Sequence, residues 1–310
     1  MATSSPQIAL AALAAFGEAI PTMALIHGAN MLSAGGPLSD LDLAASDLSP
    51  DWINQLVGAL HQHDLRILIA WPYDSAAVSL FLAAQGLQEG VQVDLLHSPD
   101  GHGKYGFRTS VALPDAIDGR FGRELAPIDS WLYQVRKRSL KGQDARLKAL
   151  LNRPPASQRE IAVRAGEVFS AGHRDVVRAV LNGKTPTEPA APRHAELRRL
   201  AFRLLHPAGL WIHLDGVGAQ EQAVELCRRC SRFVVRAEIE PDRFDPRSVN
   251  THIRTRWRAG VLITLGPGGR WSNIRVDRTD VADAVFETVR QEASVRAESQ
   301  LRLLHRKTIL

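Results

Sequence analysis

Cysteine, aromatic residues and long apolar runs are all scarce in this chain of 310 residues. The two cysteines, Cys227 and Cys230, exclude a fold held together by several disulfides. No apolar run reaches the roughly 20 residues that a membrane-spanning helix needs. The apolar stretch at 8–16 has no basic residue before it, unlike a secretory signal. We therefore expect a cytoplasmic globular protein with no membrane partner.

Positive charge is scarce in the first part of the chain. Residues 1–130 hold 5 Lys and Arg against 14 Asp and Glu, a net charge of −9, whereas residues 131–310 hold 33 against 19, a net charge of +14. The acidic part suits carboxylates that bind a metal, and the basic part suits an anionic partner such as RNA or DNA. The alternative is that the arginines only solvate helix surfaces, and both interpretations stay open.

The pattern of apolar residues predicts an α/β protein with three parts. Residues 1–127 are typical of a mixed sheet with few helices, with strands expected at 22–27, 40–44, 65–70, 78–84, 91–96 and 105–113 and helices at 7–20 and 52–63. Residues 128–206 form a basic helical region, with helices expected at 130–140, 143–151, 157–165, 173–181 and 194–205. Residues 207–310 form a small α/β module, with strands expected at 210–214, 233–237, 260–265 and 273–276 and helices at 219–230 and 280–303.

Three aspartates are the strongest candidates for chemistry. Asp40 and Asp42 are two residues apart in a predicted strand, so both side chains leave the same face. Asp94 lies in a later predicted strand. Three such carboxylates would form an oxygen site suited to Mg²⁺, which can neutralise a triphosphate and activate an attacking oxygen. The alternative is a solvated strand edge.

The order of these residues resembles that of the polymerase-β-type nucleotidyltransferase fold. A strand ending in Gly28 precedes Asp40 and Asp42, and Asp94 follows later. The resemblance covers about residues 7–150. It implies an enzyme that transfers a nucleoside monophosphate from an NTP to a hydroxyl and releases pyrophosphate. It also implies that Asp40 and Asp42 bind Mg²⁺ or Mn²⁺, with Asp94 as third ligand and base.

One position departs from that family. The superfamily usually has Gly-Ser after the first strand, and the serine touches a phosphate. In this chain Gly28 is followed by Ala29, so we expect Ser33 or Ser39 to take the role of the phosphate-binding serine. The acceptor is left open by the sequence: a nucleic acid end, a sugar or another small molecule.

A basic helix follows the predicted sheet. Tyr133, Lys137 and Lys141 lie four residues apart and therefore on one helix face. In nucleotidyltransferases the corresponding helix often supplies a lysine for the triphosphate and an aromatic residue for the base. The alternative is a solvated basic face with Tyr133 in the core. Lys104 and Arg108 are further candidates for phosphate or acceptor contacts.

The second α/β module contains an altered phosphate loop. The sequence of residues 210–226 predicts a strand, a turn and a helix, and it resembles the start of thymidylate-kinase-like P-loop kinases. Where that family has Gly-Lys-Ser/Thr, this chain has Gln220, Glu221 and Gln222. Glu221 would repel a triphosphate. We therefore expect a degenerate module with a structural role, or one that binds a second copy or another protein. Fusions of these two domain types are a bacterial arrangement.

Two other classes of protein remain alternatives to an enzyme. One is a catalytically inactive scaffold, which both departures from the family patterns favour. The other is a nucleic-acid binder that acts through Arg-rich helices at 193–203 and 228–258. Cys227 and Cys230 have the spacing of half a zinc site, but the chain has no second cysteine pair, so we interpret them as ordinary packed residues.

Overall fold

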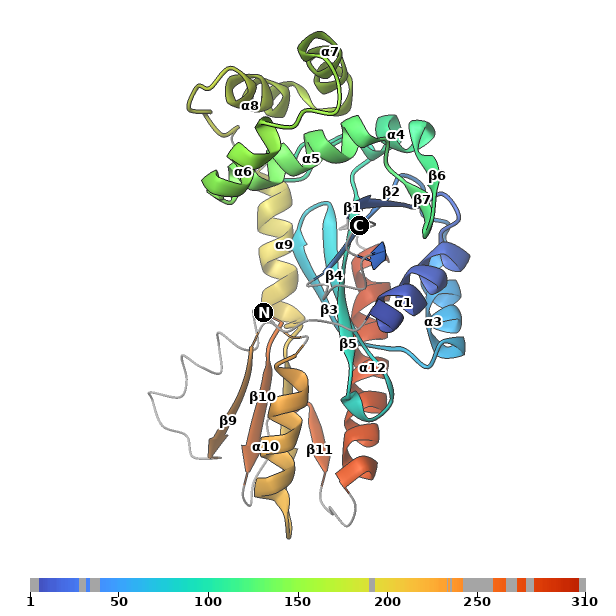
Figure 1. Ribbon diagram of the computed structural model, residues 1–310. Helices are drawn as coiled ribbons and strands as arrows, with labels where there is room; N and C mark the ends of the chain where they lie inside the picture. The colour runs from blue at the N-terminus through green and yellow to red at the C-terminus, as the bar shows by residue number, and fades with distance from the viewer. Residues whose placement is uncertain are drawn as a thin grey trace.

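The computed structural model describes residues 6–27, 32–33, 40–189, 193–232, 234, 236–241, 259–265, 272–276 and 282–306. These residues form an α/β protein with two separate sheets, as Figure 1 shows. None of the described helices is long and apolar enough to cross a membrane.

The larger sheet has seven strands in the order β3-β4-β5-β2-β1-β7-β6. β2 runs parallel to β5 and antiparallel to β1, which confirms the predicted mixed sheet. The strand bounds are β1 (Ala24–His27), β2 (Leu41–Ala45), β3 (Arg66–Asp74), β4 (Ala77–Ala83), β5 (Gly90–His97), β6 (Ile117–Gly119) and β7 (Gly122–Glu124). The short hairpin of β6 and β7 has no counterpart among the predicted strands.

The two faces of this sheet differ because apolar and polar residues alternate along β2 and β5. Leu41 and Leu43 on β2, with Val93 and Leu95 on β5, are buried in one core. That core is completed by α1 (Pro6–Ala19), α3 (Trp52–Gln62) and α12 (Ala282–Arg306). Asp42 and Asp94 therefore leave the opposite face, which packs in part against α5.

The middle region is helical, as predicted, and α7 begins at a capping box formed by Ser157 and Glu160. Its helices are α5 (Pro127–Leu140), α6 (Asp144–Leu151), α7 (Gln158–Val168), α8 (Ala171–Leu181) and α9 (Arg193–Leu205), and the short α4 (Thr109–Ala112) precedes them. The predicted strand at 105–113 is wrong. Gly106 has a φ of 64° and turns the chain, which then enters α4. A Cβ at Gly106 would lie 2.1 Å from the His173 ring, so the turn requires glycine.

The smaller sheet has four parallel strands in the order β11-β8-β10-β9. Their bounds are β8 (Leu210–Leu214), β9 (Ala237–Pro241), β10 (Val261–Leu265) and β11 (Ile274–Val276), and α10 (Ala219–Cys230) follows β8. The predicted strand–turn–helix at 210–230 is confirmed. The strand predicted at 233–237 begins later, at Ala237, because the chain still turns at 231–232 after α10.

The two sheets share a hydrophobic core. One buried cluster contains Ile69 and Phe81 of the large sheet together with Ile212, Leu226 and Phe286. Phe286 belongs to α12, whose C-terminal half also packs in the core of the large sheet. The module at 207–310 is therefore packed directly on β3 and β4 rather than tethered to them. The domain boundaries at 127 and 206 stay a prediction.

Candidate metal centre

A row of polar and aromatic side chains crosses five neighbouring strands of the large sheet. Its members are paired in register from strand to strand: Trp71 with Ser79, Ser79 with Asp94, Asp94 with Asp42, and Asp42 with His27. Paired residues on adjacent strands share a sheet face. The row therefore places Asp42 and Asp94 side by side on the face opposite the aliphatic core.

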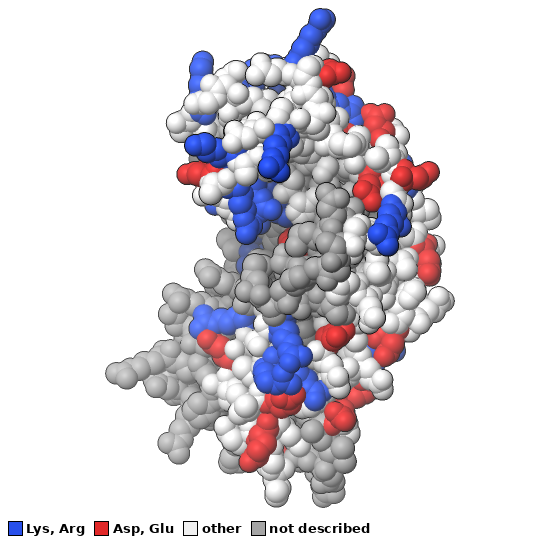
Figure 2. All heavy atoms as spheres, viewed as in Figure 1, with Lys and Arg blue, Asp and Glu red and all other residues white. Residues whose placement is uncertain are grey.

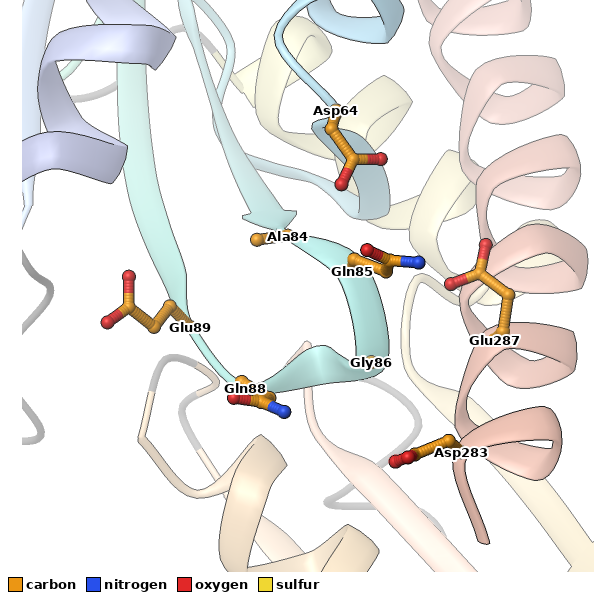
Figure 3. A pocket seen from close by; sticks show the side chains of 8 residues that line it. All are labelled: Asp64, Ala84, Gln85, Gly86, Gln88, Glu89, Asp283 and Glu287. Carbon is orange, nitrogen blue, oxygen red and sulfur yellow. The ribbon is translucent and has the colours of Figure 1, made fainter. Parts of the chain in front are cut away.

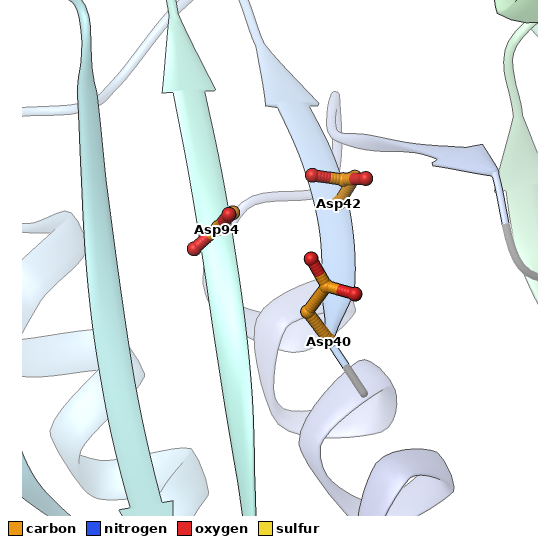
Figure 4. Close-up of side chains that lie close together, drawn as sticks. All are labelled: Asp40, Asp42 and Asp94. Atoms are coloured by element: carbon orange, nitrogen blue, oxygen red, sulfur yellow. The ribbon is translucent and has the colours of Figure 1, made fainter. Parts of the chain in front are cut away.

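The three predicted aspartates converge at this row. Asp40, Asp42 and Asp94 each offer one oxygen, and these atoms lie within 4.8 Å of one another (Figure 4). Oxygens around an octahedral Mg²⁺ are about 3 to 4 Å apart, and the donor set is all carboxylate, so small rotations would fit the site to Mg²⁺ or Mn²⁺. Among the residues that the structure describes, this is the one group of three or more that could hold a metal.

Asp42 is the most enclosed of the three. Its side chain is 1% exposed, and both of its oxygens accept hydrogen bonds from the Lys137 ammonium, at 2.7 and 2.5 Å. Burial alone would raise the pKa of Asp42, but Lys137, with His27 beside it, holds that pKa below its usual value. The His27 Nε2 atom lies 3.6 Å from the carboxylate. Asp42 is thus a carboxylate kept ionised by its neighbours.

Asp94 has the opposite electrostatic environment. Burial and the neighbouring charge of Asp42 raise the pKa of Asp94 to about 6. Ser79 Oγ and Gln92 Nε2 donate hydrogen bonds to its Oδ1 atom, at 2.5 and 2.8 Å. These bonds fix the orientation of the carboxylate, and no described residue donates to its Oδ2 atom. Two aspartates at neighbouring positions therefore differ in proton affinity.

All three tyrosines of the chain lie near these carboxylates. Tyr133 is 1% exposed and packs edge-on against Tyr105, with ring centroids 5.3 Å apart. The Lys104 ammonium lies 4.6 Å from the Tyr73 ring and 5.0 Å from the Tyr105 ring. Burial raises the pKa of each tyrosine, so the hydroxyls stay neutral. Tyr133 thus forms part of an aromatic wall and does not present an open stacking surface.

Helix α5, which carries Lys137, is fixed by buried polar contacts. Arg164 of α7 donates to both oxygens of the fully buried Asp129, at 2.7 and 2.6 Å. Arg136, also fully buried, binds Glu188 and His173. These pairs tie α5 to the rest of the helical region, and they set the place of Lys137 relative to Asp42.

The remaining predicted residues have different placements. Lys141 directly follows α5 and is exposed. Arg108 donates to the Glu167 carbonyl, away from the carboxylates. Gly28 and Ser39 lie outside the described residues. His27 and Ser79 also belong to the site although neither was predicted as a site residue. His27 carried one usable signal, its place immediately before Gly28 at the end of β1.

The strand–turn–helix of the small sheet has no comparable group of side chains. Val217 in the turn is 95% exposed, and Glu221 occupies the first turn of α10. The positions that correspond to a phosphate-binding Lys and Ser/Thr are Glu221 and Gln222. Cys227 and Cys230 belong to α10, and burial raises the pKa of both thiols.

A separate acidic cavity of about 520 Å³ lies at the other end of β4 and β5, beside α12 (Figure 3). Its carboxylates already have partners. Arg290 binds both Asp64 and Glu287, and Arg229 lies 3.8 Å from Asp283. The Asp64 pair links α12 to the turn before β3, and the Asp283 pair links α12 to α10. We interpret the cavity as part of that packing.

Comparison of the chain with protein-family models gave no match, and comparison with curated proteins gave no significant match either.

Proposed function

We propose that the protein is a Mg²⁺-dependent nucleotidyltransferase with a polymerase-β-type fold in its N-terminal part. The observation that carries the proposal is the convergence of Asp40, immediately before β2, with Asp42 of β2 and Asp94 of the adjacent parallel strand β5. The mixed sheet and the basic helix that packs on its carboxylate-bearing face are consistent with that fold. A scaffold without catalytic function would not need three carboxylates at one point, where they repel one another.

Each residue of the site has a role that its surroundings support. Asp40 and Asp42 hold the metal, and a bound divalent cation supplies positive charge for the triphosphate. Lys137 and Lys141 bind phosphate oxygens. Asp94 completes the metal site and takes the proton of the acceptor hydroxyl.

The proposed transfer conserves atoms and charge. The acceptor oxygen forms a bond to the α-phosphorus of the NTP, the bond from that phosphorus to the bridging oxygen breaks, and pyrophosphate leaves with the electron pair. The acceptor proton passes to Asp94. The aromatic wall of Tyr73, Tyr105 and Tyr133 limits the access of water that would compete with the acceptor.

The charge distribution favours an anionic acceptor, such as the end of an RNA or DNA strand. In Figure 2, Lys and Arg gather on the middle helices and again over the small-sheet module, where Asp and Glu lie beside them, and further Asp and Glu lie along the opposite edge. We propose that the small-sheet module supports the large sheet and contributes positive surface rather than binding a nucleotide.

The direct test is transfer of a labelled nucleotide. Each α-³²P-labelled NTP is incubated with the full chain, Mg²⁺ or Mn²⁺, and either total RNA or a mixture of sugars. We expect label to enter an acceptor and pyrophosphate to appear, and we expect the D40N/D42N variant to give neither. Equal label transfer by this variant would refute the assignment of these aspartates.

A further inference from the structure

The Lys137 ammonium occupies the side of the carboxylate cluster that a metal would need. It is bound by both oxygens of Asp42 and lies 3.9 Å from an oxygen of Asp40. Lys137 is 3% exposed and comes from α5, 95 residues away in the chain from Asp42. A lysine in this position neutralises a buried carboxylate whose other close basic neighbour is the His27 imidazole.

An ammonium and a divalent ion compete for the same oxygens. Mg²⁺ or Mn²⁺ would need an Asp42 oxygen at about 2.1 Å, where the lysine hydrogens now point. Two cations held on one carboxylate also repel each other. Metal binding therefore requires the ammonium to leave Asp42 or to weaken its contact.

The Lys137 side chain can move even though helix α5, which carries it, is held in place. Lysine has a flexible four-carbon stem, whereas α5 is held by the buried pair of Asp129 and Arg164. Lys141 lies on the same face of α5, one turn farther on, and it is exposed. A triphosphate drawn to Lys141 would bring its oxygens within reach of Lys137.

We propose that Lys137 is an exchangeable counter-ion, which holds Asp42 in the free protein and transfers to the triphosphate when nucleotide and metal enter together. The inference rests on the metal site of the proposed function. It adds an order of events. A metal that enters alone competes with the Lys137 ammonium for Asp42, whereas a metal that enters with a triphosphate does not, because the triphosphate takes up the ammonium. Binding of the metal and of the polyphosphate is then positively coupled through one side chain.

The test uses Mn²⁺ alone and Mn²⁺ with inorganic tripolyphosphate, titrated by calorimetry into the full chain after removal of metals with a chelator. We expect K137M to bind Mn²⁺ alone roughly tenfold or more tighter than the wild type, within the usual range of coupling between sites. Tripolyphosphate should then tighten Mn²⁺ binding more in the wild type than in K137M. K148M, at an exposed lysine of α6, is the control and should match the wild type.

Folding of the variant can be checked independently. K137M leaves Asp42 without its cation, so Mn²⁺ should raise the Tm of K137M more than that of the wild type. If K137M does not fold, K137Q is used in its place in every titration, because its side-chain amide keeps an N–H donor for Asp42. Mn²⁺ affinity in the lysine variants equal to or below that of the wild type, with D42N binding none, would overturn the exchange but leave the metal site intact. Absence of Mn²⁺ binding in all forms, with or without tripolyphosphate, would overturn the metal site itself.

Discussion

The large and small sheets differ in the side chains that their strands and the following turns bring together. On the large sheet, Asp42 and Asp94 are in register on parallel strands, and Lys137 reaches them from a fixed helix. On the small sheet, the turn after β8 exposes Val217 and is followed by Glu221. An α/β topology can position side chains for a functional site, but convergent charged side chains are needed before such a site can form.

The largest expected effect is at Asp94, the proposed general base. D94N should lower nucleotide transfer about a thousandfold, because general-base catalysis typically contributes between a hundredfold and ten-thousandfold. The matched control is D283N, which changes an exposed aspartate at the start of α12. Transfer rates of the two variants with the same labelled NTP test the difference, and equal rates would show that Asp94 has no special role.

A second substitution tests whether the two sheets are one cooperative unit. Phe286 is fully buried in the core that both sheets share, so F286A should lower the free energy of unfolding by about 3–5 kcal/mol. V295A on the same helix, at a residue 68% exposed, should change it by less than about 0.5 kcal/mol. Urea unfolding followed by circular dichroism and tryptophan fluorescence should give coincident transitions. Separate transitions would contradict the shared core.

A pH effect is expected in the helical region that holds α5. Burial and then the Arg136 guanidinium lower the pKa of His173 to about 4. The folded state therefore binds its proton less readily than the unfolded chain, and stability falls as the pH drops from about 6.5 towards 4. Because His173 is only partly buried, we expect roughly 1–2 kcal/mol from this group.

H173Q should remove that part of the pH dependence. The matched control is H63Q, at a histidine beside Glu18 on the large-sheet side, which should keep the wild-type slope. Free energies of unfolding between pH 4 and 7 provide the measurement. An H173Q slope equal to that of the wild type would assign the acid sensitivity to other groups.

The smallest expected effect concerns the small sheet. E221Q removes the negative charge from the first turn of α10, where a P-loop would have its lysine. We expect no change in nucleotide affinity, since we propose that the nucleotide binds at the large sheet. Equilibrium dialysis of each NTP in Mn²⁺ checks this, and tighter binding by E221Q would indicate a nucleotide site after β8.

Much of the fold and part of the site could be predicted from the sequence. Alternation of leucine with Asp40 and Asp42 predicted a shared strand face, and the 3.6-residue periodicity predicted α5 to α9. The ion pair of Lys137 with Asp42 could not be predicted, because it depends on how a helix packs on a sheet. Ser79 joins the row only through the register of β4 on β5, which tertiary contacts determine. The strand predicted at 105–113 failed because Gly106 turns the chain.

The most direct test of the central claim is a calorimetric titration of each NTP into the full chain, in Mn²⁺ and in EDTA. Wild type and D40N/D42N are compared at the same protein concentration. The proposed site predicts that at least one NTP binds only when Mn²⁺ is present, and that the double variant loses this binding. Binding that persists in EDTA and in D40N/D42N, or no binding by the wild type, would contradict a metal-dependent nucleotide site at these aspartates.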